Sequence, residues 1–166
     1  LASALIRNGC RLDPVVFTKR FQEVISQYYV TREIDLVERP VEGYLKHVLS
    51  EFGITEISGE IIRSSLSEMY RVTQAYWHLE ADTISTLENL QKMGVKLGLI
   101  TNAANPEDAN HLIDRNGLRT YFKTILISAC EGIRKPDPRI FNRGLENMGA
   151  LPENSAMVGD TLRADI

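Results

Sequence analysis

The sequence has few cysteines and histidines, and neither residue type is clustered. Cys10 and Cys130 are the two cysteines among 166 residues, and they are far apart in the chain. This spacing excludes the disulfide framework of a small secreted protein and predicts reduced thiols in a cytoplasmic protein. The histidines, His47, His78 and His111, are scattered, so the sequence predicts no histidine-based metal site.

The chain also lacks an excess of positive charge and a long apolar run. Its formal net charge is −3, which gives no basic field for nucleic acid or an anionic membrane surface. No apolar run reaches the roughly 20 residues of a membrane-spanning helix. The opening stretch "LASALIRNGC" has neither an initiating Met nor the basic and apolar regions of a secretory signal. The composition is typical of a globular protein and indicates no oligomeric state.

Residues 1–78 have a helical pattern throughout. Two apolar stripes repeat with the spacing of one helix face, and Ser58 can cap a third helix. The stripes consist of Phe17, Phe21, Val24, Ile25 and Tyr28, and of Val41, Tyr44, Leu45, Val48, Leu49 and Phe52. No stretch of this half alternates with the period of a strand. The pattern predicts an all-α unit.

Residues 79–166 instead alternate between short apolar runs and helical stretches. Three runs favour buried strands: "KLGLITN" (96–102), "KTILIS" (123–128) and "SAMVG" (155–159). Asp82, Asn105-Pro106 and Asp137-Pro138 are typical helix starts, and a glycine follows each predicted helix. Short connections between strand and helix indicate right-handed crossovers. The sequence therefore predicts an α/β unit with a parallel sheet.

Polar side chains follow each of these predicted strands. Thr101 and Asn102 follow the first, Lys135 lies in the loop after the second, and Asp160 and Asp165 follow the third. Ligands of open α/β sheets bind beyond the carboxyl ends of the strands. A hydroxyl, an ammonium and two carboxylates at that edge suit phosphoryl transfer with Mg²⁺. Taken singly, these residues fit a turn, an exposed charge or a helix cap, but together they favour one common site.

Three stretches resemble the second, third and fourth motifs of the haloacid dehalogenase-like (HAD) hydrolase superfamily. They are "LGLITNA", "GIRKPDPRIF" and "MVGDTLRADI", and they occur in the order and near the spacing of that family. The helical half is similar to the four-helix cap that the family inserts after its first motif. The resemblance implies a helical cap over 1–78 and a Rossmann-like parallel sheet over 79–166.

The resemblance also implies a role for each site residue. Thr101 and the backbone N–H of Asn102 would bind the phosphoryl group, and Lys135 would bridge it to the nucleophile. Asp160 would ligate Mg²⁺, and Asp165 would support the metal directly or through lysine or water. In the family an aspartate attacks phosphorus, and the aspartyl-phosphate is then hydrolysed. The implied function is a Mg²⁺-dependent phosphatase of a small phosphorylated metabolite.

The family's first motif, Asp-x-Asp-x-Thr/Val, does not occur in the sequence. Neither Asp13 in "RLDPVVF" nor Asp35 in "REIDLVE" has the required partner two residues on. The resemblance places this motif just upstream of Leu1, on a central strand between those ending at Thr101 and Asp160. We therefore expect a fragment that lacks the nucleophile strand and the family's C-terminal end, and that has no appreciable turnover alone.

Two other readings of the parent protein remain open. A 2-haloacid dehalogenase shares the fold and the nucleophile but uses no metal, which the pair Asp160 and Asp165 disfavours. A catalytically dead family member acting as a binding or scaffold module would lack the nucleophile. The sequence does not identify the substrate, although Tyr28, Tyr29, Arg32 and Tyr44 are polar or aromatic candidates for selecting it.

Overall fold

The computed structural model describes residues 1–165, and the chain forms two compact units. The helical unit consists of Leu1–Asp35 and Arg39–Trp77, and the α/β unit of Leu36–Glu38 and His78–Ile166. The short segment Leu36–Glu38 therefore belongs to the second unit although it lies between two helices of the first. None of the helices within residues 1–165 combines the length and the hydrophobicity that a membrane span requires.

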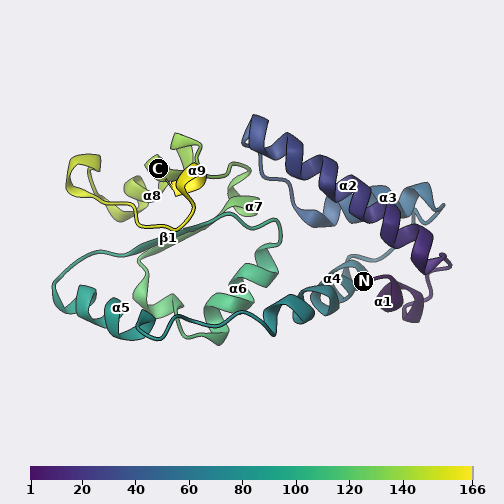
Figure 1. Cartoon of the computed structure of the whole chain (residues 1–166), viewed down its shortest axis with the longest axis horizontal. Coiled ribbons are helices and arrows are strands. Elements are labelled where there is room, and N and C mark those ends of the chain that lie inside the picture. Colours follow the sequence, from purple (N-terminus) through teal and green to yellow (C-terminus); the bar gives the residue numbers. More distant parts are fainter. Residues whose placement is uncertain (166) are drawn as a thin grey trace. The chain divides into compact units, whose positions relative to one another are not determined.

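The helical unit contains α1 (Ala2–Arg7), α2 (Pro14–Asp35), α3 (Val41–Glu51) and α4 (Gly59–Gln74), as Figure 1 shows. α2 packs against α3, and α1 packs against α4. The predicted apolar stripes form the core between the helices. Its buried members are Phe17, Phe21, Val24 and Tyr28 on α2 and Val41, Leu45, Val48 and Leu49 on α3. Ser58 caps α4 as predicted, since its side chain accepts a hydrogen bond from the Ile61 N–H at 3.2 Å.

The helical unit also buries a small polar side chain of α4. Ser65 of α4 is fully buried, and its hydroxyl has no hydrogen-bond partner among the described residues. We expect Ser65→Ala to raise the free energy of unfolding by about 1 kcal/mol, because a buried unpaired hydroxyl is costly. Urea unfolding measures this, with Ser64→Ala as the control, since the exposed Ser64 hydroxyl bonds to the Ile61 carbonyl. An unchanged or lower stability of Ser65→Ala would contradict the prediction.

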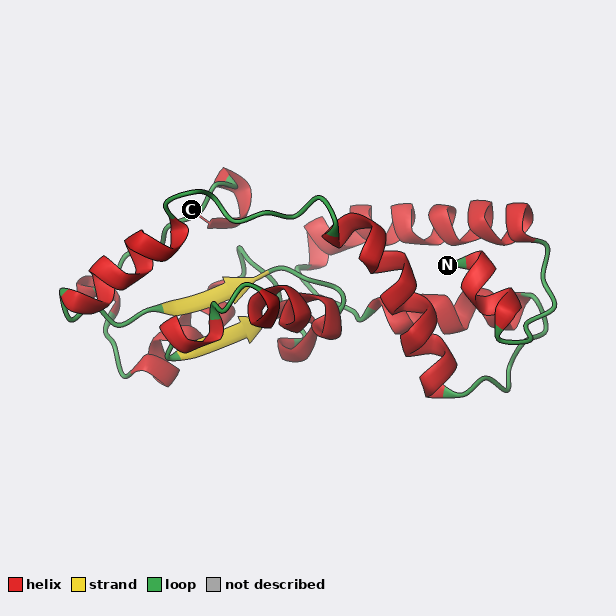
Figure 2. Cartoon of the chain, turned by 90° about the horizontal axis from the view of Figure 1, so that it is seen from below, coloured by secondary structure: helices red, strands yellow, loops and turns green. Residues whose placement is uncertain are grey.

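The α/β unit is built on two parallel strands, β1 (Gly98–Thr101) and β2 (Thr124–Ile127), with Thr101 opposite Ile127. Both strands point the same way in Figure 2, where they are yellow. Its longer helices are α5 (Thr83–Lys92), α6 (Pro106–Arg115) and α8 (Pro138–Met148), and its short ones are α7 (Ser128–Glu131) and α9 (Leu162–Asp165). Two 3₁₀ turns, Arg119–Tyr121 and Pro152–Asn154, complete the unit.

α8 packs on both strands and closes a small apolar core. The core contains Leu126, Ile133 and Ile140, with Ile100 and Phe141 against it. Gly144 lets α8 approach β1 closely, because an added Cβ there would lie 3.2 Å from the Ile100 Cδ1. The predicted caps Asn105 and Asp137 accept backbone N–H bonds at the starts of α6 and α8. Asp82 occupies the cap position of α5, but its side chain makes no capping bond within the described chain.

The third predicted strand is wrong. Residues 155–159 are exposed and form no strand in the described chain, and β1 pairs with β2 alone there. A strand is stabilised by hydrogen bonds to a neighbour. The family resemblance places a further strand between β1 and this segment, but within residues 1–165 the only strand beside β1 is β2. The apolar run "SAMVG" therefore has no partner strand to pair with.

Candidate functional site

The end of β1 is tied to the loop that carries Lys135. Asn102 directly follows β1, and its side-chain amide donates to the Lys135 carbonyl at 2.9 Å. The Lys135 N–H donates in return to the Asn102 Oδ1 at 2.8 Å. This two-way contact joins residues 33 positions apart. It brings Thr101, Asn102 and Lys135 to the carboxyl edge of the sheet, as the sequence predicted.

Lys135 and Asp165 form a buried ion pair. The Lys135 Nζ lies 2.5 Å from the Asp165 Oδ1, and the two side chains are 12% and 4% exposed. The Asp165 Oδ2 also accepts the Thr161 N–H at 3.0 Å. The hydrogen bond from Lys135 lowers the pKa of the Asp165 carboxyl, and the Thr161 N–H acts in the same direction. Asp165 therefore stays ionised and fixes the direction of the lysine ammonium.

Asp160 lies just before α9, the helix that carries Asp165, but is not part of this pair. It is exposed, and its Oδ1 accepts the Thr161 hydroxyl at 3.3 Å. The preceding Gly159 is sterically required, because an added Cβ would overlap the Asp165 carboxylate. No group of three or more His, Cys, Asp or Glu side chains within residues 1–165 is placed to hold a metal ion.

The two aspartates that lack the first-motif pattern have structural roles in the helical unit. The Asp13 Oδ1 accepts the N–H groups of Val15 and Val16 at the start of α2, each at 2.9 Å. Asp35 pairs with Arg39 at 2.8 Å. Both carboxylates are therefore engaged in local contacts of the helical unit.

Sequence patterns missed three buried polar residues beside the Lys135 loop: Glu38, Ser128 and Arg134. Glu38 and Ser128 are 90 residues apart, and the Ser128 hydroxyl donates to the Glu38 Oε2 at 2.9 Å. Nothing in the spacing of the chain indicates such a contact. The one available signal was "RK" at 134–135, where a second cation stands beside the predicted site lysine.

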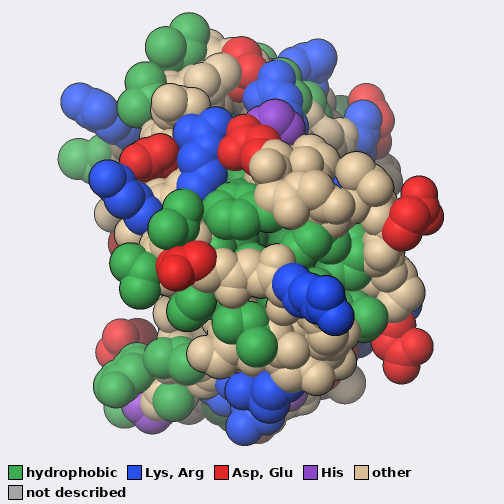
Figure 3. Space-filling view, turned by 90° about the vertical axis from the view of Figure 1, so that its right-hand side faces the viewer, with side chains coloured by type: hydrophobic (Ala, Val, Ile, Leu, Met, Phe, Trp, Pro, Cys, Tyr) green, Lys and Arg blue, Asp and Glu red, His purple; other side chains and the backbone are tan. Residues whose placement is uncertain are grey.

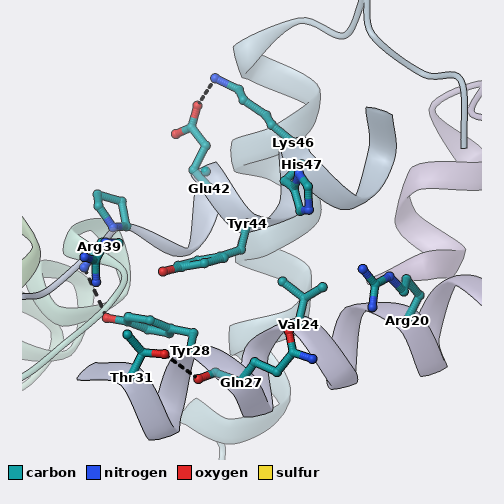
Figure 4. A pocket seen from close by; sticks show the side chains of 12 residues that line it. Arg20, Val24, Gln27, Tyr28, Thr31, Arg39, Glu42, Tyr44, Lys46 and His47 are labelled. Carbon is teal, nitrogen blue, oxygen red and sulfur yellow. Dashed lines mark hydrogen bonds and ion pairs between the residues drawn. The ribbon is translucent and has the colours of Figure 1, made fainter. Parts of the chain in front are cut away.

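The helical unit has a cavity of about 720 Å³ between α2 and α3, shown in Figure 4. The aromatic rings of Tyr28 and Tyr44 pack against each other there, with their centroids 4.6 Å apart. Its cations are matched by carboxylates: Lys46 by Glu42 at 2.6 Å, Arg20 by Glu51 at 2.7 Å, and Arg39 by Asp35 at 2.8 Å. Figure 3 likewise shows charges of both signs interspersed over one face of the molecule. The cavity therefore offers no excess positive charge for a phosphoryl group.

Because Asp165 is ion-paired with Lys135, we expect the free energy of unfolding to decrease at acidic pH. Because the pKa of Asp165 is lower in the folded than in the unfolded chain, where it is about 3.9, the pair stabilises fully above that value. Its contribution is lost as the pH falls through the lower folded pKa. We expect Asp165→Asn to cost about 1.5–3 kcal/mol at pH 7 and progressively less below about pH 4. Urea unfolding across this pH range measures the difference.

A double-mutant cycle provides the control for this prediction. In a Lys135→Met background, the Asp165 carboxylate has lost its partner, so Asp165→Asn should no longer produce the same pH-dependent difference. An equal effect in both backgrounds would show that the acid dependence arises elsewhere.

Comparisons with known proteins give the family of this chain. Two curated relatives, both named glyceraldehyde 3-phosphate phosphatase, come from Methanopyrus kandleri and Methanothermobacter thermautotrophicus. The first is 30% identical over 81% of this chain and 63% of its own length, and the second is 32% identical over 84% and 61%. The chain thus spans about three fifths of the length of these relatives.

Two solved structures have a fold similar to that of this chain. The crystal structure of a HAD phosphatase from Thermococcus onnurineus has a TM-score of 0.55 at 26% identity, covering 89% of this chain and 60% of that one. The putative HAD-hydrolase YfnB from Bacillus subtilis, solved bound to magnesium, shares the fold with a TM-score of 0.56 at 22% identity, covering 98% of this chain and 71% of that one. The sequence model of the haloacid dehalogenase-like hydrolases matches residues 2–166. The chain therefore belongs to the haloacid dehalogenase-like hydrolase family.

Proposed function

We propose that the protein, at its full natural length, is a Mg²⁺-dependent phosphatase of a small phosphorylated metabolite. One observation carries the proposal: the Lys135 ammonium is held by Asp165 at the end of β1, where Asn102 anchors the lysine backbone. A cation fixed at the carboxyl edge of a parallel sheet suits an anionic phosphoryl group. The names of the glyceraldehyde 3-phosphate phosphatases and of a phosphoserine phosphatase from Thermus thermophilus, 34% identical over 61% of this chain and 40% of its own length, point the same way.

Each residue at the carboxyl edge of the sheet has a separate part in binding the phosphoryl group. The Thr101 hydroxyl and the Asn102 N–H donate to its oxygens, while the Asn102 side chain stays on the Lys135 backbone. The Lys135 ammonium offsets negative charge as it develops on the transferring group, and preorganised electrostatic stabilisation of this kind is usually the largest single contribution to catalysis. Asp165 keeps the ammonium in place through each turnover.

The carboxylates also fit the binding of Mg²⁺. Mg²⁺ in phosphoryl-transfer sites takes one or two carboxylates, retains waters and binds the substrate phosphate. The exposed Asp160 can serve as a direct ligand. Asp165 is ion-paired with Lys135, so it would support the metal indirectly, by holding the lysine ammonium. When bound, Mg²⁺ would neutralise charge on the phosphoryl oxygens.

The two cysteines, Cys10 and Cys130, are free thiols, which fits a protein of a reducing compartment such as the cytoplasm.

The attacking group is assigned to an aspartate outside the 166 residues. The motif Asp-x-Asp-x-Thr/Val does not occur in the sequence, and Asp13 and Asp35 are engaged in the helical unit. We expect the 166-residue chain by itself to release no measurable phosphate, because covalent catalysis requires the nucleophile.

The test is phosphate release by the full-length protein from an aryl phosphate, glyceraldehyde 3-phosphate and phosphoserine, with Mg²⁺ and with EDTA. We expect turnover with Mg²⁺ and its loss with the chelator, restored when Mg²⁺ is added back. Halide release from a 2-haloacid that continues in EDTA would instead identify a dehalogenase. Absence of both activities, with an intact fold, would support a binding or scaffold module and overturn the proposal.

A further inference from the structure

The segment Leu36–Glu38 is built into the α/β unit by backbone contacts. Val37 forms an antiparallel bridge with Ile133. The Arg134 N–H donates to the Leu36 carbonyl at 3.1 Å, and the Glu38 N–H donates to the Gly132 carbonyl at 3.3 Å. These contacts fall on the residues that immediately precede Lys135. The segment thus lies directly along the loop that carries the site lysine.

Glu38 places a fully buried carboxylate at this point. Its side chain is 0% exposed, and the Arg134 side chain beside it is 8% exposed, with the Arg134 Nε 3.5 Å from the Glu38 Oε2. The same oxygen accepts the Ser128 hydroxyl at 2.9 Å. An isolated buried charge is very unfavourable, so these two partners compensate the carboxylate. Glu38 therefore holds Ser128 and Arg134 in one arrangement.

Each of these partners leads to a different part of the phosphoryl site. Ser128 begins α7 and accepts the Ala103 N–H at 2.8 Å, two residues after Thr101. Arg134 is the residue before Lys135 and is held by its own backbone bond to Leu36. A single carboxylate thus connects the segment after β1 with the lysine loop. It makes these contacts without lying among the residues proposed to touch the substrate.

We propose that Glu38 is a positioning residue that sets the distance between the Thr101 segment and Lys135. The proposal rests on the proposed function, because it assumes that these two elements bind one phosphoryl group. Glu38 acts through Ser128 and Arg134, and a shift of either element would misplace the ammonium relative to the hydroxyl. Misplacement by about 1 Å can cost a hundredfold in rate.

If Glu38 served only to stabilise the fold, restoring stability would also restore activity. Substituting Glu38 and Arg134 together distinguishes this structural role from the positioning role. Removing one partner of a buried ion pair leaves an uncompensated charge, whereas replacing both with uncharged groups is often neutral for stability. Glu38→Gln alone should therefore lower stability, and Glu38→Gln with Arg134→Met should recover it. If Glu38 positions the site, the double variant recovers stability but not kcat.

The experiment measures three quantities on the full-length protein. They are the urea midpoint, kcat and KM for an aryl phosphate, and the hydrogen-exchange rates of the Ala103 and Lys135 amides. Ser128→Ala tests the link to the Thr101 segment while leaving the ion pair in place. Glu131→Gln is the matched control, because Glu131 lies on α7 and pairs with Arg143 nearer the surface.

We expect Glu38→Gln and Ser128→Ala to lower kcat at least tenfold with little change in KM, and to speed exchange at the Ala103 amide. The double variant should show the wild-type urea midpoint with kcat still reduced, and Glu131→Gln should match wild type in every measurement. Recovery of kcat together with stability in the double variant would overturn the proposal. Unchanged exchange at Ala103 and Lys135 in folded Glu38→Gln would also overturn it, whether or not the protein hydrolyses phosphate. A wild-type protein without phosphatase activity would overturn the proposed function instead.

Discussion

Replacing Lys135 by Met is expected to reduce kcat/KM for phosphate monoesters by about a hundred- to a thousandfold, the usual effect of removing one preorganised stabilising group. The ammonium is held at 2.5 Å from Asp165 and has little freedom to move. Its loss removes positive charge from the position where the proposed reaction develops negative charge. Steady-state assays with saturating Mg²⁺ measure the change.

Lys123→Met is the control for this prediction. Lys123 lies in the same unit, is exposed, and donates to the Met148 carbonyl at 3.1 Å rather than to a site residue. Its replacement removes the same formal charge but should leave kcat/KM within about twofold, since surface changes away from special features have small effects. Equal losses in both variants, or wild-type activity in Lys135→Met, would refute the role assigned to Lys135.

Ile140→Ala is expected to lower the free energy of unfolding of the α/β unit by about 2–5 kcal/mol. Ile140 on α8 is fully buried and packs with Leu126 and Ile133 between the helix and the sheet. Truncation removes its apolar contacts and leaves a cavity that a short two-stranded sheet cannot readily fill. Hydrogen exchange of the β1 and β2 amides under native conditions measures the unfolding of this unit by itself.

Leu151→Ala is a matched control for the core substitution. Leu151 is also a large aliphatic residue of the α/β unit, but it is 58% exposed. Its truncation should change the free energy of unfolding by less than about 0.5 kcal/mol. A cost for Ile140→Ala as small as that for Leu151→Ala would show that α8 does not carry the stability of the sheet.

Most of the local structure follows from patterns within short stretches of sequence. The stripe from Phe17 to Tyr28 predicted α2, and the caps Ser58, Asn105 and Asp137 predicted where α4, α6 and α8 begin. These signals are local, because a cap or an apolar face depends on residues within one or two turns. The run at 155–159 is also apolar at its centre, but a strand requires a neighbour to pair with, which no local pattern contains.

In the candidate site too, some features follow from the local sequence and others depend on contacts between distant residues. Thr101, Asn102 and Lys135 could be placed together because the carboxyl ends of two parallel strands share one edge. Asp165 was assigned to that edge through a third strand that residues 155–159 do not form. The contacts that hold them could not be predicted. The reciprocal bonds of Asn102 with the Lys135 backbone depend on side-chain orientation, and Glu38 reaches Ser128 from 90 residues away. The roles of Asp160 in binding Mg²⁺ and of Thr101 in binding phosphate remain predictions.

Because Leu36–Glu38 belongs to the α/β unit, that unit consists of two stretches that are separated in the sequence. A recombinant piece that began at His78 would keep Arg134 and Ser128 but lack the carboxylate that neutralises one and binds the other. A piece ending at Trp77 would carry Glu38 without either partner. An uninterrupted segment that begins at His78 therefore cannot form the native hydrogen bond and ion pair of Glu38, which lies in the other piece.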